Sequence, residues 1–139
     1  MKKLSLLLFF IMCSHASVYA NDLKPCPDKP NCVSSKADDE HAIAPFHLKQ
    51  SEPFNHQRFI EALTQLDDSI SITQNENYIH AEVTSRVFRF VDDLDLIIDI
   101  EQQLIHVRSA SRTGYYDFGV NRRRVEKLRS LFKQHGIIL

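Results

Sequence analysis

The segment DLDLIIDIEQQLIHVR, residues 93–108, carries the clearest structural pattern in this sequence. Apolar and polar residues alternate along it with a period of two, which is the pattern of β-strands that bury one face. A turn at Gln102-Gln103 would join two such strands into an antiparallel hairpin. The predicted pairs are Ile100 with Ile105 and Ile98 with Val107 on the apolar face, and Asp93 with Arg112, Ile97 with Arg108 and Asp99 with His106 on the polar face.

The residues that precede this hairpin indicate a second one. Residues 70–83 also alternate, and a turn at Asn75-Glu76 sets Ile72 opposite Ile79 on an apolar face. The connecting segment RVFRFV, residues 86–91, leaves three alternatives open. It extends the preceding strand, forms a separate strand, or wraps an edge of the sheet.

Helices are predicted on either side of the four strands. The first begins near Asn55, a good N-cap, and ends by Asp67, with Phe54 and Phe59 at the spacing of a hydrophobic staple. The second spans residues 122–135, with Asn121 as its cap.

The order helix, four strands, helix defines the expected fold class. The connections between strands are too short for parallel crossovers, so the sheet should be antiparallel. We predict a two-layer α+β domain over residues 53–139, with a sheet of about four strands and both helices on one face.

The N-terminus resembles an export signal. Two lysines precede the apolar run LSLLLFFIM, residues 4–12, and Val18-Tyr19-Ala20 offers small residues at a cleavage site. The apolar run is too short to span a membrane. Cys13 follows Met12 rather than a small residue, so lipid attachment is not expected. We predict a cleaved signal peptide over residues 1–20, export to the periplasm, and no transmembrane segment in the mature chain.

Residues 21–52 are polar, have little periodicity, and are predicted to form an extended arm. The arm contains Cys26 and Cys32 in PCPDKPNC, and two cysteines in an exported protein are expected to form a disulfide. No spacing of cysteines or histidines matches a metal site, and His41 and His47 are expected to be loop residues. We expect neither a metal nor a cofactor.

The composition limits both the architecture and the partners. The chain has 139 residues, which suits one domain, and 17 basic against 18 acidic residues give a net charge of -1. Removing Lys2 and Lys3 with the leader changes the balance to 15 - 18 = -3. A nucleic-acid binder carries a marked basic excess, so nucleic acid is not an expected partner.

Charge is unevenly distributed along the chain, because residues 75–103 are mainly acidic and residues 104–135 mainly basic. The loop TGYYDFGVN, residues 113–121, contains Gly114 and Gly119 and leads into the last helix. In a chain with three glycines, these positions are expected to need a positive φ or a close approach of the backbone. The candidate ligand-binding residues gathered around this loop and the hairpin are Arg108, Arg112, Asp117, Asn121, Arg122, Asp92 and Asp93.

Arginines in such a group could present guanidinium forks to a carboxylate or phosphate. The plainer interpretation is a salt-bridged sheet surface and a capped loop, since exposed ion pairs are common and individually weak. Both interpretations use the same residues, and the sequence leaves both open.

Three segments, CPDKPNCVSS, FRFVDD and VRSASRTGYYDFGVNRRRVEKLR, together resemble a bacterial and plastid family known as domain of unknown function 1499. The resemblance extends from about Lys24 to Phe132, and the long C-terminal segment is its most specific part. The family implies no activity or catalytic residues. Its motifs fall on the two cysteines and on all of the candidate residues named above.

Three functions are compatible with the sequence. The first is a non-catalytic module that binds an anionic small molecule, a lipid headgroup or an envelope protein through Arg108, Arg112 and Arg122. The second is a hydrolase that uses Asp92 or Asp93 with Asp117 or His106 as acid and base. The third is a purely structural envelope protein, for which a large exposed apolar patch would be the sign.

Overall fold

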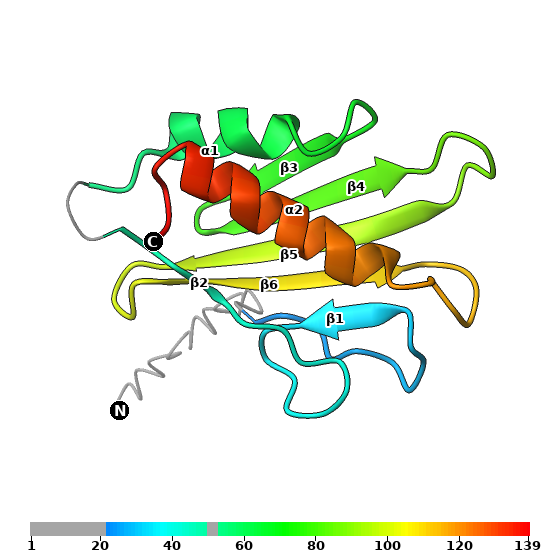
Figure 1. Ribbon diagram of the computed structural model, residues 1–139. Helices are drawn as coiled ribbons and strands as arrows, with labels where there is room; N and C mark the ends of the chain where they lie inside the picture. Colours follow the sequence, from blue (N-terminus) through cyan, green and yellow to red (C-terminus); the bar gives the residue numbers. More distant parts are fainter. Residues whose placement is uncertain (1–21, 50–52) are drawn as a thin grey trace, which may run out of the picture.

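A computed structural model describes residues 22–49 and 53–139, so the predicted signal peptide lies outside the described residues. The fold is α+β, with a six-stranded antiparallel sheet and two helices (Figure 1). The elements in chain order are β1 (Cys32–Ser34), β2 (Phe46–His47), α1 (His56–Thr64), β3 (Ser71–Asn75), β4 (Tyr78–Thr84), β5 (Val91–Asp99), β6 (Leu104–Ser111) and α2 (Val120–Gln134).

The four strands predicted from the sequence are β3 to β6, and the N-terminal arm adds two more. The strand order is β1-β6-β5-β4-β3, and β2 also pairs with β6. Cys32 of β1 lies opposite Ala110, and Phe46 of β2 lies opposite Ile105. The arm is therefore an edge of the sheet, and Val33 and Phe46 belong to the hydrophobic core.

The predicted register of the central hairpin is wrong by two residues. Ile98 pairs with Ile105, and Asp95 pairs with Arg108. The connection is a four-residue loop over residues 100–103, in which Asp99 Oδ1 accepts a hydrogen bond from the Gln102 N–H at 2.8 Å. Ile100 consequently lies in this loop, 43% exposed, instead of on the buried face.

The β3–β4 hairpin shows the same displacement. Its turn is Glu76-Asn77, so Ile72 pairs with Ala81 and not with Ile79. Glu76 adopts a positive φ of 50°, an uncommon conformation for glutamate that the sequence did not indicate. Because side chains alternate with a period of two, a shift of two residues leaves every side chain on its predicted face.

Helix α1 agrees with the prediction, whereas α2 begins differently. The Asn55 side chain accepts a hydrogen bond from the Arg58 N–H at 2.9 Å, and the Phe54 and Phe59 rings are 5.5 Å apart. Helix α2 begins at Val120, so Asn121 lies inside the first turn and is not the cap. The cap residue is Gly119, whose φ of 74° confirms the expected left-handed conformation.

Both helices cover the same face of the sheet (Figure 1). The core contains Phe59 and Leu63 from α1, Leu128 and Phe132 from α2, and the apolar residues of β4 to β6. The charged residues of the predicted polar face lie on the opposite side of the sheet. Residues 85–90 form the loop between β4 and β5, and Val91 begins β5, so the RVFRFV segment neither extends β4 nor forms a separate strand.

Candidate functional site

A buried polar network lies beneath the first turn of α2, and we call it the brace. Its members are Asn31, Asp92, Ser109, Ser111, Asp117, Asn121 and Arg124. The Arg124 guanidinium donates to Asp92 Oδ2 at 2.5 Å, to Asn121 Oδ1 at 2.7 Å and to the Ser109 hydroxyl at 3.1 Å. These bonds tie the start of α2 to β5 and β6.

Asn121 is the centre of the brace and is fully buried. Its amide donates to the Asn31 carbonyl oxygen at 3.0 Å, to the Ser111 hydroxyl at 2.9 Å and to Asp117 Oδ2 at 2.8 Å. The Ser109 hydroxyl donates to Asn121 Oδ1 at 2.6 Å. The side chain therefore joins the disulfide loop, the sheet and the α2 turn, which explains why Asn121 is not free to cap the helix.

Asp117 supplies the capping function expected of Asn121. Its carboxylate accepts from the Gly119 N–H at 2.8 Å and from the Asn121 N–H at 3.0 Å. Burial alone would raise the pKa of Asp117, but the hydrogen bonds from Asn121 and Gly119 outweigh it and lower the pKa. Asp117 thus remains ionised at the positive end of the helix dipole.

On the face of the sheet opposite the helices, Asp95 gathers three partners from two neighbouring strands. Its Oδ1 accepts from the Tyr78 hydroxyl at 2.6 Å and pairs with His80 Nδ1 at 2.8 Å. Its Oδ2 accepts from Arg108 Nη1 at 3.3 Å. Burial, followed by the hydrogen bond to Asp95, raises the pKa of Tyr78. Asp95 itself is only 5% exposed, so its carboxylate is held by these three partners and is not open to a ligand.

Arg112 forms the second charged group on this face. Its guanidinium donates to both oxygens of Asp93, at 2.6 and 3.1 Å, and also to Glu82. The hydrogen bond from Arg112 lowers the pKa of Glu82. The predicted Asp93–Arg112 pair therefore forms, although the two residues are diagonal neighbours in the observed register.

Arg122 differs from the other two candidate arginines. It donates to the Ala42 carbonyl oxygen at 3.0 Å and to the Glu40 carbonyl oxygen at 3.2 Å, and it forms no ion pair with a carboxylate of the described residues. It lines a groove of about 460 Å³ between the disulfide loop and the 113–119 loop. The walls of this groove include Pro30, Val33, Glu40, His41, Tyr116 and Phe118.

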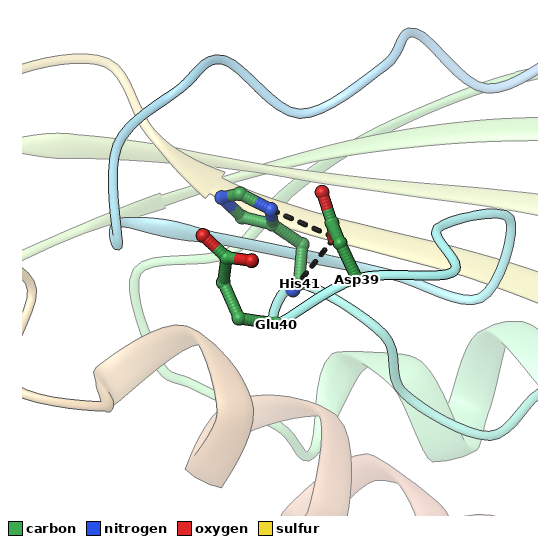
Figure 2. A group of neighbouring side chains, drawn as sticks. All are labelled: Asp39, Glu40 and His41. Atoms are coloured by element: carbon green, nitrogen blue, oxygen red, sulfur yellow. Dashed lines mark hydrogen bonds and ion pairs between the residues drawn. The ribbon is translucent and has the colours of Figure 1, made fainter.

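His41 lines the groove, and Figure 2 shows its imidazole beside Asp39. Its Nδ1–H donates to Asp39 Oδ1 at 2.9 Å and its Nε2–H to the Lys29 carbonyl oxygen at 3.0 Å. Since both acceptors lack hydrogens, only the imidazolium satisfies both bonds. Burial lowers the pKa of His41, but the bonds to Lys29 and Asp39 together exceed that effect and raise it. The His41 side chain thus ties the disulfide loop to the 39–41 turn.

Two groups of described side chains have donors close enough to hold a cation. One is Asp39, Glu40 and His41, in which both ring nitrogens of the histidine already bind protein oxygens. The other is His80, Glu82 and Asp93, in which Arg112 already binds both carboxylates. A metal ion would have to displace these partners.

The structure separates the predicted site residues into three places. Arg108, Arg112 and Asp93 lie on the charged face of the sheet, whereas Asp92, Asp117 and Asn121 belong to the brace, and Arg122 lines the groove. The three arginines do not converge on one ligand position.

The acid and base groups weighed for a hydrolase are also dispersed. Asp92 binds Arg124, Asp93 lies on the other face, and His106 is buried with Ser35 3.4 Å from its Nδ1. Asp95 was missed by sequence reasoning, because the predicted register placed Ile97 opposite Arg108. A register shifted by two would have revealed it as the partner of Arg108.

A family model described as a protein of unknown function, DUF1499, matches residues 22–132. The chain belongs to this family. No curated protein and no solved structure matches the chain. Within the described part of the chain, every helix is too short or too polar to cross a lipid bilayer.

The family segments recognised in the sequence correspond largely to the brace and to the disulfide. Asp92, Ser109, Asp117 and Asn121 all belong to the brace, and the sulfur atoms of the two cysteines are 2.04 Å apart. Several residues of these segments thus hold the fold together.

Proposed function

We propose that this chain is a non-catalytic binding module of the cell envelope, and that the groove beside Arg122 takes a ligand with an anionic group and an apolar portion. The predicted export to the periplasm supports the location. The observation that carries the proposal is Arg122, a fixed guanidinium in a groove with no carboxylate bound to it among the residues described.

The guanidinium remains able to bind an anion. It has five N–H groups, of which two are used by the Glu40 and Ala42 carbonyl oxygens. Those two bonds hold the side chain in place, which reduces the entropy lost when a ligand binds. The remaining N–H groups suit a carboxylate or a phosphate.

The rest of the groove favours an apolar neighbour for that anion. Tyr116 and Phe118 are 65% and 85% exposed, and their ring centroids are 6.5 Å apart. A ligand between them and Val33 would cover aromatic surface that now faces water. Glu40 lines the same groove and opposes an anion there, so its removal should strengthen binding.

Phenyl phosphate, which joins an aromatic ring to a phosphate, is a suitable probe. We expect the purified protein to bind it in calorimetry or NMR titration more tightly than inorganic phosphate. Arg122→Gln should weaken binding about tenfold or more, because hydrogen bonds to charged groups contribute about 1.5–3 kcal/mol. Glu40→Gln should tighten binding, and Lys133→Gln, an exposed change in the last turn of α2, should have no effect.

Arg122→Gln should weaken phenyl phosphate binding and Glu40→Gln should strengthen it, and these opposite changes in affinity make the test specific to the groove. The proposal is wrong if the wild-type protein does not bind phenyl phosphate, or if Arg122→Gln binds it as the wild-type protein does. Circular dichroism of each variant verifies that the fold is retained.

A further inference from the structure

Exposed apolar side chains gather at one end of the molecule. Of the nine large hydrophobic residues that are exposed in the described chain, seven lie in or next to two loops. They are Val87, Phe88, Phe90, Tyr115, Tyr116, Phe118 and Val120. The loops, residues 85–90 and 113–119, are at the same end of the sheet, on the right in Figure 1. We call this surface the aromatic end.

The backbone holds these side chains outward. Arg89 and Phe118 adopt positive φ values of 57° and 54°, and the Ser85 side chain accepts a hydrogen bond from the Phe90 N–H at 3.0 Å. The bases of the two loops are joined, since the Arg112 N–H donates to the Val91 carbonyl oxygen at 3.1 Å. The aromatic end is therefore built into the fold.

The exposure of these side chains is costly in water. Val87 is 80% exposed and Phe88 is 71% exposed, and the Phe88 ring stacks on that of Phe90, with centroids 5.5 Å apart. Clusters of exposed apolar residues of this kind mark interaction surfaces. The charge around this surface restricts the kind of partner that fits it.

Arginines without acidic partners surround the apolar tips. Arg89 is exposed, and Arg123 donates to the Phe118 carbonyl oxygen at 2.8 Å. Neither forms an ion pair with any carboxylate in residues 22–49 or 53–139, and the same holds for Arg122. Arg89, Arg122 and Arg123 outnumber Asp117, the acidic residue of the 113–119 loop, although the whole chain has a charge of -1.

We propose that the aromatic end docks on an anionic lipid surface. Aromatic and aliphatic side chains flanked by arginines are typical of segments that bind at the membrane interface. Val87, Phe88 and Phe118 enter the headgroup region, and Arg89 and Arg123 bind lipid phosphates. Two projecting loop tips suit a deformable lipid layer, because no groove is needed to receive them. Phe118 also lines the Arg122 groove, but Val87, Phe88 and Arg89 do not, so docking can be tested separately from ligand binding in the groove.

Flotation with lipid vesicles tests the proposal directly. Vesicles of phosphatidylcholine alone are compared with vesicles that contain phosphatidylglycerol at about one lipid in three. We expect the wild-type protein to float with the anionic vesicles, and the bound fraction to fall when salt rises from about 0.1 M to about 0.5 M.

The variants separate the apolar and the charged contributions. The double variant Val87→Ser/Phe88→Ser should lower the partition coefficient about tenfold or more. Arg89→Gln/Arg123→Gln should lower it about 25-fold, because each arginine near an anionic surface contributes about fivefold. Ile100→Ser is the matched control, since Ile100 is 43% exposed but lies in the loop between β5 and β6.

Absence of wild-type binding to either vesicle overturns the proposal, as does wild-type partitioning of the Val87→Ser/Phe88→Ser variant. If wild type binds no vesicle but the aromatic end crosslinks to an envelope protein, that protein is the partner and the lipid assignment is wrong. Phenyl phosphate binding by Val87→Ser/Phe88→Ser should stay normal, so failure of this proposal is distinguishable from failure of the groove.

Discussion

Breaking the Asp92–Arg124 ion pair should destabilise the fold strongly. The two side chains are only 12% and 11% exposed, and their charged atoms are 2.5 Å apart. Asp92→Asn leaves the Arg124 cation buried without its counter-charge, and removing one partner of a buried pair costs about 3–5 kcal/mol. We take about 3 kcal/mol, because Arg124 keeps its bonds to Ser109 and Asn121.

This loss would be a large part of the total stability, since a domain of this size is stable by about 5–15 kcal/mol. Urea unfolding, followed by far-ultraviolet circular dichroism, measures it as a lower midpoint with an unchanged slope. Arg124→Met should cost a similar amount, and the double variant Asp92→Asn/Arg124→Met should cost less than the sum of the two.

The exposed pair Asp68–Arg86 provides the control. Its side chains are 91% and 82% exposed, with charged atoms 2.9 Å apart. Asp68→Asn should change the free energy of unfolding by about 0.5 kcal/mol or less. If Asp92→Asn costs no more than Asp68→Asn, the brace does not hold α2, and the structural role assigned to Asp92 is wrong.

Three further predictions concern the arm and the charged face. His41 has a raised pKa in the folded protein, so its contribution to the free energy of unfolding should be complete below its unfolded-state pKa of about 6.5 and should be lost as pH rises through its folded-state pKa. His41→Gln should therefore flatten this part of a curve of stability against pH. His106 has a lowered pKa, mainly through burial, so its contribution to the free energy of unfolding should instead be lost as pH falls. His106→Gln should therefore lose less stability than the wild-type protein when the pH is lowered. Reduction of the Cys26–Cys32 disulfide should cost about 2 kcal/mol in thermal or urea unfolding, by the entropy of closing a short loop; an unchanged midpoint would contradict this.

Local patterns were sufficient to predict α1 and the two faces of the sheet. Asn55 and Phe54 act within one helical turn, so their roles follow from spacing alone. Alternation likewise assigns each strand residue to a face. It does not fix the register, because a shift of two residues leaves the faces unchanged. Ile100 therefore looked like a core residue, while the loop is determined by the bond from Gln102 to Asp99.

The remaining errors concern contacts between distant residues. β1 and β2 have three and two residues, too few to show alternation, and both depend on pairing with β6. Asn121 was predicted as a cap because asparagine suits that role locally. Its amide instead binds the carbonyl oxygen of Asn31, 90 residues earlier, which no local pattern reveals.

The division between brace and exposed loops has a consequence for mutational studies of this family. Substitutions at Asp92 or Asn121 should lower function by destabilising the fold and reducing the amount of folded protein, and would be mistaken for losses at a catalytic site. Arg122 and Phe88 are exposed, so their substitution removes a binding group while the core is unchanged. A phenotype from Arg122→Gln or Phe88→Ser at wild-type stability would therefore locate function outside the motif residues of the brace. The same phenotype from Asp92→Asn alone would reflect only the loss of folded protein.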